Sequence, residues 1–176
     1  MPELLKNLTS LNEDFKYHGL DMVEETISKS NEKYITKYKN WKFTLFDLKK
    51  GILPNDYDLI VSRSDLIVSR DALQHLSLYY VYQVLKSFAD VKNAKYLLVG
   101  SYLDDIQNKN NFLINLSKPP FNLDQYIEIF KEKNDDLDQK YLILYDISNY
   151  LSKVNFEKIK TDVLKFQGLD NLFFTV

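Results

Sequence analysis

Short apolar runs alternate with longer segments of helical spacing along most of this chain. The first run, Phe15 to Leu20, stops at Asp21, and Val23 to Tyr38 then places its apolar residues roughly on one helical face. Trp41 to Phe46 is the next run, and it stops at Asp47. Alternation of this kind is typical of strand-helix-strand units and of a mostly parallel sheet. The pattern therefore predicts an α/β fold.

The middle of the chain continues the alternation. Apolar runs at Tyr57 to Ser62 and Tyr96 to Gly100 predict a third and a fourth strand, and Ala72 to Phe88 predicts a helix between them. Ser77 is placed to act as an internal cap of that helix. Asp104 to Pro120 is polar and ends in two prolines, which predicts a long surface loop.

The C-terminal part has a different pattern. Tyr126 to Phe130 and Lys140 to Tyr145 are strand-like runs joined by the acidic turn Asn134 to Asp138, so they predict an antiparallel hairpin. Tyr150 to Phe166 then has helical spacing. A length of 176 residues is in the range of one domain, and we expect a single domain over residues 1–176.

One hexapeptide occurs twice. Asp58 to Arg63 and Asp65 to Arg70 both read Asp-Leu-Ile-Val-Ser-Arg, and only Ser64 separates them. Side chains of a strand alternate with a period of two, so a repeat of odd period cannot continue one strand with its faces preserved. We expect one copy to fill a strand and the other to bulge, loop out or form an added edge.

Composition narrows the classes of function. The formal net charge is -2 with acidic and basic residues interspersed, so nucleic acid is not indicated as a partner. The chain has no cysteine, which excludes disulfides and thiolate metal sites and fits a reducing compartment. Its apolar runs are too short to span a bilayer. We expect a cytoplasmic protein with no membrane segment and no metal site.

Several segments resemble one enzyme family in the order that the family requires. Asp65 to Ser77 resembles the fourth strand and following turn of class I S-adenosylmethionine-dependent methyltransferases. His18 to Asp21 resembles the second strand with its terminal acid, Phe43 to Asp47 the third, and Lys95 to Gly100 the fifth. The resemblance reaches to about Ile147. It implies a Rossmann-like sheet of seven strands with the last one antiparallel, and S-adenosylmethionine across the carboxyl ends of the first strands.

The segment that follows the predicted strand Tyr96 to Gly100 also has a counterpart in the family. Asn115-Leu116 and Pro119 to Asn122 resemble the loop that follows a strand in an uncharacterised methyltransferase-like subfamily. Prolines hold such a loop rigid at low entropic cost, so it suits a lid over a methyl acceptor. A rigid crossover into the hairpin would need the same residues.

The resemblance implies roles for two acids that follow predicted strands. Asp21 stands where an acid accepts hydrogen bonds from both ribose hydroxyls of the cofactor, and Asp47 stands where an acid faces its adenine amino group. Each acid also has a simpler interpretation. Asp21 suits a helix N-cap, and Asp47 needs no function as a loop carboxylate after a strand.

A polar group follows the segment Asp65 to Ser69. In the family this turn borders the methyl-donor pocket, so the resemblance implies that Arg70 contacts the cofactor and that Asp71 and His75 orient the acceptor or take its proton. In the alternative interpretation these residues begin a helix, with Asp71 stabilised by the helix N-terminus and His75 packed beside it.

The glycines argue against an intact cofactor site. The chain contains Gly19, Gly51, Gly100 and Gly168, and no two of them lie near each other. No Gly-x-Gly turn exists, so the close backbone approach that seats S-adenosylmethionine is not provided. We therefore expect a methyltransferase-like chain that does not transfer methyl groups by itself.

The family's central first strand, which precedes the glycine turn, also has no counterpart in this sequence. Its loss leaves two strand edges unpaired, and three arrangements satisfy them: direct closure of the gap, insertion of the spare hexapeptide, or pairing with another chain. We expect direct closure. A non-catalytic interaction module that self-associates through an open sheet edge, and a fragment of a complete methyltransferase, are the two other hypotheses.

Overall fold

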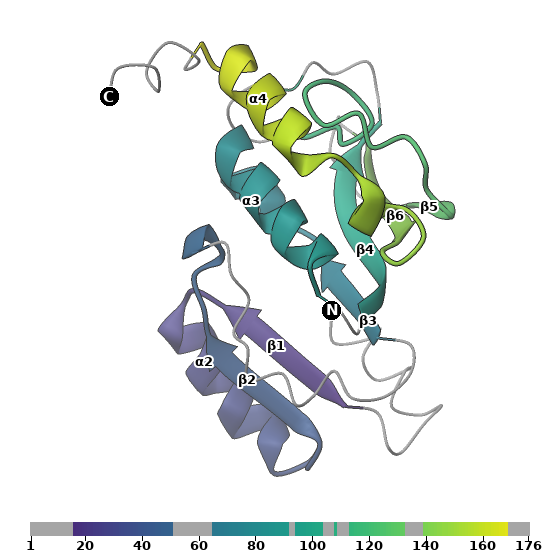
Figure 1. Cartoon of the computed structure of the whole chain (residues 1–176). Coiled ribbons are helices and arrows are strands. Elements are labelled where there is room, and N and C mark those ends of the chain that lie inside the picture. Colours follow the sequence, from purple (N-terminus) through teal and green to yellow (C-terminus); the bar gives the residue numbers. More distant parts are fainter. Residues whose placement is uncertain are drawn as a thin grey trace. The chain divides into compact units, whose positions relative to one another are not determined.

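The computed structural model describes residues 16–50, 65–91, 94–103, 108, 113–132 and 139–168. Its elements are labelled in Figure 1. The chain divides into two compact units, residues 1–50 and residues 51–176. A compact unit is not by itself an independently folding domain, so the single domain expected over residues 1–176 stays a prediction.

The first unit contains two parallel strands joined by a helical crossover. Strand β1 (Tyr17–Asp21) pairs with β2 (Trp41–Leu45), and helix α2 (Glu24–Ser30) lies between them in sequence. A short π-helical segment, η1 (Asn31–Ile35), extends α2, and a 3-10 turn, η2 (Leu48–Lys50), follows β2. These elements confirm the strand-helix-strand unit that the alternation predicts, since parallel strands require a crossover of this kind.

Aromatic side chains hold this unit together. The indole of Trp41 stacks on the ring of Tyr38, with 4.1 Å between the ring centroids, and Tyr34 and Tyr17 lie at 5.6 Å and 5.2 Å from it. Trp41 is the buried hydrophobic side chain of residues 16–50, with 6% of its surface exposed. Helix α2 has no buried residue. The described part of the first unit therefore buries few side chains, and its packing is centred on Trp41.

The second unit contains a four-stranded sheet. Its strand order is β3 (Asp65–Ser69), β4 (Ala94–Tyr102), β6 (Lys140–Asp146) and β5 (Glu128–Lys131). β3 and β4 are parallel, whereas β6 is antiparallel to both β4 and β5. Over both units the described strands make two parallel and two antiparallel pairings, so the expected parallel majority is not seen in this part of the chain.

Two capped helices complete the second unit. Helix α3 (Leu78–Ala89) begins after Ser77, whose hydroxyl accepts a hydrogen bond from the backbone N–H of Tyr80. A separate 3-10 turn, η3 (Leu73–His75), precedes it, so the helix expected from Ala72 is in two pieces. Ser77 is extended, with φ -65° and ψ 157°, and this interrupts the helix. Helix α4 (Phe156–Phe166) follows η4 (Leu151–Lys153).

The core of the second unit lies between this sheet and the helices. α3 and α4 lie side by side (Figure 1), and the rings of Tyr82 and Phe156 contact each other with centroids 6.4 Å apart. β4 buries alternate residues on one face, as the period of a strand requires. The side chains that are buried most completely include Val81, Val84, Leu97, Val99, Ile143, Tyr145, Leu151 and Val163.

Within the described residues β1 pairs with β2, and β3 pairs with β4 in a sheet of the other unit. The direct closure expected between these two sheets stays a prediction. The second hexapeptide supplies β3. The first copy and the strand expected at residues 57–62 lie outside the described residues.

Candidate functional site

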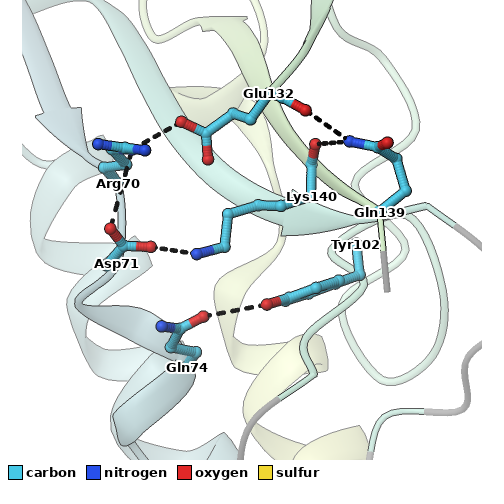
Figure 2. Close-up of polar contacts among 7 residues, drawn as sticks. All are labelled: Arg70, Asp71, Gln74, Tyr102, Glu132, Gln139 and Lys140. Atoms are coloured by element: carbon cyan, nitrogen blue, oxygen red, sulfur yellow. Dashed lines mark hydrogen bonds and ion pairs between the residues drawn. The ribbon is translucent and has the colours of Figure 1, made fainter. Parts of the chain in front are cut away.

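Four charged side chains meet at one edge of the four-stranded sheet. Arg70 and Asp71 follow the carboxyl end of β3, Glu132 follows β5, and Lys140 begins β6. Because β6 runs antiparallel to β4, its start lies at the same edge as the carboxyl ends of β3 and β4. Figure 2 shows the four side chains directed toward one another. We call them the β3-edge cluster.

The contacts within the β3-edge cluster alternate in charge. Arg70 Nε donates to Glu132 Oε1 at 2.6 Å and lies 3.8 Å from Asp71 Oδ2. Lys140 Nζ donates to Asp71 Oδ1. Two cations and two carboxylates form a chain from Glu132 to Lys140 (Figure 2), and its formal charge is balanced. Such a network holds β3, β5 and β6 in place at this edge.

Burial differs between the members of the cluster. The side chains of Glu132 and Lys140 are 11% and 15% exposed, whereas those of Arg70 and Asp71 are 42% and 47% exposed. Burial alone would lower the pKa of Lys140, but the hydrogen bond and the charge of Asp71 outweigh it, so this pKa is raised. Lys140 therefore remains protonated near neutral pH and cannot act as a base.

Neutral side chains support the cluster. Gln139 donates from Nε2 to the carbonyls of Glu132 and Lys140, at 2.8 Å each. The Tyr102 hydroxyl donates to Gln74 Oε1 at 3.3 Å (Figure 2). The Gln139 bonds join the ends of β5 and β6, and the Tyr102 bond joins the end of β4 to the segment between β3 and α3, so the cluster rests on regular secondary structure.

Gly100 allows β3 to leave the sheet where it does. A Cβ atom built on Gly100 would lie 1.9 Å from the backbone oxygen of Arg70. Only a residue without a side chain fits this approach, because the obstacle is backbone rather than a movable side chain. The position of Arg70, and with it the cluster, therefore depends on a glycine in the neighbouring strand.

The structure brings Asp71 and Arg70 together, as the sequence predicts, but in an ion-paired state. Asp71 lies within ion-pair distance of two cations, Arg70 and Lys140. His75 is exposed in η3, and its Nε2 lies 3.4 Å from Gln74 Nε2. The roles proposed for Asp71 and His75 in orienting an acceptor stay predictions.

Asp21 and Asp47 lie at the carboxyl ends of the adjacent parallel strands β1 and β2. Asp21 Oδ1 accepts from the backbone N–H of Val23 at 2.8 Å, and Asp47 Oδ1 accepts from Lys49 at 2.9 Å. Each is a bond from an aspartate to its own backbone two residues on, which is a common turn device. The contact of Asp47 is compatible with its simpler interpretation as a loop carboxylate. The N-cap expected at Asp21 is wrong, because Val23 occupies the N-cap of α2 and Asp21 lies two residues before it.

The loop before the hairpin is fixed by buried amides. Asn108 Nδ2 donates to the carbonyls of Asn115 and Pro119 at 2.8 Å each, and Asn115 N donates to Asn108 Oδ1 at 2.7 Å. Asn115 is fully buried, and Phe121 is 2% exposed. The Pro119-Pro120 peptide is cis. The loop is therefore held in place, which suits both the rigid crossover and the proline-fixed acceptor lid, so both interpretations stay open.

Sequence reasoning missed Glu132, Lys140, Gln139 and Tyr102. Glu132 and Lys140 are 62 and 69 residues from their partners at the end of β3, so no local spacing identifies them. The available signal was their place at the ends of the two hairpin runs. Within the described ranges, no three His, Cys, Asp or Glu residues gather as a metal site would need, and no helix could cross a membrane.

The described strands and helices form a mixed α/β fold, and its likeness to solved structures is methyltransferase-like. No protein-family model matches the chain, and no curated protein matches it. TehB from Haemophilus influenzae superposes with a TM-score of 0.51 at 16% identity, over 75% of this chain and 50% of its own. The PH0226 protein from Pyrococcus horikoshii OT3 gives 0.50 at 18%, over 79% and 76%.

A third solved structure is a named methyltransferase. Human N-acetylserotonin methyltransferase, in complex with SAM, gives a TM-score of 0.50 at 14% identity, over 81% of this chain and 44% of its own. The present chain thus spans half of TehB and less than half of the human enzyme. Likeness at these identities shows the fold alone.

Proposed function

We propose that this chain is a methyltransferase-like protein that does not transfer methyl groups by itself. The observation that carries the proposal is the absence of any Gly-x-Gly turn from the sequence. Methyl transfer asks the protein mainly to hold donor and acceptor in line, so loss of the donor-seating turn removes catalysis rather than slowing it.

The strand order supports the same proposal. The methyltransferase sheet that the sequence resembles places its first strand between the second and the fourth. The described sheets have the orders β1-β2 and β3-β4-β6-β5, and both are compatible with a family sheet from which that central strand is missing.

The residues proposed to hold the cofactor do not fit it well. One carboxylate oxygen of Asp21 accepts a bond from the chain's own backbone, and the same is true of Asp47. Arg70, proposed as a cofactor contact, is paired with Glu132. These pairings leave fewer side-chain groups free to bind S-adenosylmethionine than the cofactor requires. We therefore assign no methyl-transfer step to these residues.

Equilibrium dialysis with labelled S-adenosylmethionine tests the proposal. We expect no saturable binding up to about 1 mM, the weak end of specific affinities. The matched control is the double variant Asp21→Asn, Asp47→Asn, which should behave like the natural chain. Micromolar binding that the double variant loses, together with turnover of any acceptor, would contradict the proposal.

A second candidate function is a non-catalytic interaction module that self-associates. The observation that favours it is that β1 and β3 each have one partner strand in the part of the chain that the structure describes. Unpaired strand edges recruit further strands. Size-exclusion chromatography with light scattering over a wide concentration range tests this function, and a monomer at every concentration would exclude it.

A third candidate is a piece of a complete methyltransferase. It is favoured by the share of the solved relatives that the chain spans, which is half for TehB. The test is to read the coding sequence upstream of Met1 for a strand followed by a glycine-rich turn. A chain extended by that segment should then bind S-adenosylmethionine, and failure of the extended chain to bind would exclude this candidate.

A further inference from the structure

Charged side chains are distributed unevenly over the first unit. Residues 16–50 contain eight lysines and five acidic residues, a formal charge of +3, whereas the whole chain carries -2. Four of the five acids follow the carboxyl ends of β1 and β2 or begin α2, namely Asp21, Glu24, Glu25 and Asp47. The net charge of the whole chain does not indicate a nucleic-acid partner, but it averages over this asymmetry.

Five lysines lie at the opposite, amino end of the strand pair. Because β1 and β2 are parallel, their first residues lie at the same end (Figure 1). The backbone N–H of Tyr17 donates to the carbonyl of Asn40 at 3.2 Å, which brings the residue before β1 beside the turn before β2. The η1 segment leads into the same turn. We call the five residues the amino-end lysines: Lys16, Lys33, Lys37, Lys39 and Lys42.

The positive charge of the amino-end lysines is largely uncompensated. All five are exposed, and in the part of the unit that the structure describes none of them forms an ion pair with a carboxylate. The ion pair described there joins Lys29 to Glu25. The fifth acid, Glu32, lies in η1 and offsets one of the five charges. After burial, the charge of Lys42 is the second cause that lowers the pKa of His18. This end of the unit is therefore electropositive.

The helix dipole accounts for two of these lysines. Cations are favourable near the carboxyl end of a helix, and Lys33 and Lys37 lie at the end of the helical segment. Lys16, Lys39 and Lys42 lie before β1, in the turn and in β2, outside that segment. Helix stability therefore does not explain why all five charges gather at one end.

The aromatic rings at this end are engaged within the unit. Tyr38 stacks on Trp41 with 4.1 Å between the ring centroids, and Tyr34 lies 5.6 Å from the same indole. The ammonium groups of Lys33 and Lys37 lie 5.2 Å and 5.4 Å from the ring centroids of Tyr34 and Tyr38. Proteins hold single-stranded nucleic acids largely by stacking bases on aromatic rings. These rings are occupied, so the amino-end lysines suit phosphates rather than unstacked bases.

Most of the exposed apolar side chains of the unit lie at its other end. Met22, Val23 and Leu45 are exposed by half or more and belong to the carboxyl end of the strand pair. Ile35, which is 43% exposed, is the one in η1. Binding to a membrane surface combines cations with apolar side chains that enter the lipid. Here the two are mostly separated, which favours a partner that presents phosphates without an apolar phase.

We propose that the amino-end lysines bind the phosphate backbone of a nucleic-acid duplex without reading its sequence. A duplex carries closely spaced phosphates outside and keeps its bases stacked inside. Lysine is a point charge on a flexible stem, which suits contacts to phosphates along a backbone. The dissociation constant lies in the range of about 10⁻⁴ to 10⁻⁶ M that is typical of such contacts. This surface does not depend on the proposed absence of methyl transfer, so either proposal can fail without the other.

Fluorescence anisotropy with a labelled DNA duplex of mixed sequence tests the proposal. The logarithm of affinity should fall linearly with the logarithm of salt concentration, with a slope of at most about 4.5, because each neutralised phosphate contributes about 0.9. Lys39→Gln with Lys42→Gln should lower this slope by about 1.8 and weaken binding at low salt by about tenfold or more. The matched control is Lys49→Gln with Lys50→Gln, which removes two exposed charges after β2 and should bind like the natural chain.

Further variants and probes separate charge from fold. Lys39→Arg with Lys42→Arg keeps both charges and should bind like the natural chain. Thermal unfolding should be the same for all of these variants, since the substituted side chains are exposed. The proposal is wrong if the duplex does not bind at low salt, or if the control pair weakens binding as much as the amino-end pair. It is also wrong if a single strand of the same sequence, or vesicles that contain phosphatidylserine, bind as tightly as the duplex.

Discussion

The two compact units differ most in how much apolar surface they bury. In residues 16–50 the buried hydrophobic side chain is Trp41, and α2 buries none. The second unit buries hydrophobic residues on α3, on α4, on β4 and β6, and in the loop before β5. The first unit exposes Met22, Val23 and Leu45, each by half or more.

This difference shows which packing a pair of parallel strands requires. Parallel sheets occur almost always with both faces covered and with more than two strands. In residues 16–50 the pair of strands β1 and β2 has helix cover from α2 and η1. We expect its amides to exchange with solvent well before those of the second unit, because local stability follows buried apolar contact.

The largest expected effect is a core truncation in the second unit. Leu97 is fully buried in β4, so Leu97→Ala should lower the free energy of unfolding by about 3 kcal/mol through lost transfer energy and a cavity. Ile27→Ala, on the half-buried face of α2, should cost roughly 1 kcal/mol or less. Urea unfolding followed by fluorescence measures both. Equal losses of unfolding free energy in the two variants would show that the two units do not differ in packing.

Glycine substitutions give the next largest contrast. In Gly100→Ala the new methyl group meets the backbone oxygen of Arg70, so we expect a loss of about 2 to 3 kcal/mol. In Gly19→Ala it meets Cδ1 of Phe43 at 2.7 Å. That ring lies in the thinly packed unit and can move, so the loss should be smaller, about 1 kcal/mol. Thermal unfolding of both variants checks the order, and a greater loss for Gly19→Ala would contradict it.

The sequence predicted the elements better than their assembly. Short stretches of sequence were enough to predict the strands that begin at Trp41 and Lys140 and the cap at Ser77, because strand periodicity and capping are local properties. The order of the strands was less accessible, because strand pairing depends on edges that are distant in the sequence, and the direct closure expected between the two sheets stays a prediction.

The candidate site shows the same limit. Asp71 and Arg70 stood out because they are adjacent to a predicted strand end. No sequence pattern identified their ion partners Lys140 and Glu132, because only the pairing register of the hairpin brings them to that edge. A role assigned to Asp71 from its sequence position therefore left out the two cations that it contacts.

Helix caps provide a smaller contrast between the units. Asn155 accepts a hydrogen bond from the N–H of Lys158 at 3.0 Å at the start of α4, so Asn155→Ala should cost about 1 kcal/mol. Val23 occupies the N-cap of α2 in an extended conformation and offers no side-chain acceptor. Val23→Asn should therefore stabilise the first unit by up to about 1 kcal/mol. Hydrogen exchange of the α2 and α4 amides measures both changes, and unchanged α2 protection would show that capping does not limit the first unit.

The smallest expected effect is a pH dependence confined to the first unit. Burial, and then the charge of Lys42, lower the pKa of His18 below its ordinary value of 6.5, and its Nε2 lies 2.8 Å from Thr44 Oγ1 across the strand pair. The unfolded chain binds a proton at this histidine at a higher pH than the folded chain does. Stability is therefore full above about pH 6.5 and falls as the pH drops below that value.

Hydrogen exchange of the β1 amides between about pH 7.5 and about pH 5.5, corrected for intrinsic rates, should show this loosening while the β4 amides stay protected. His18→Gln should flatten the pH dependence, because no titrating group then remains at that position. His75→Gln, which removes the other histidine, should leave the dependence of β1 unchanged. If β1 loosens equally in His18→Gln, acid acts on the first unit through another group, and the half-buried histidine does not set its stability.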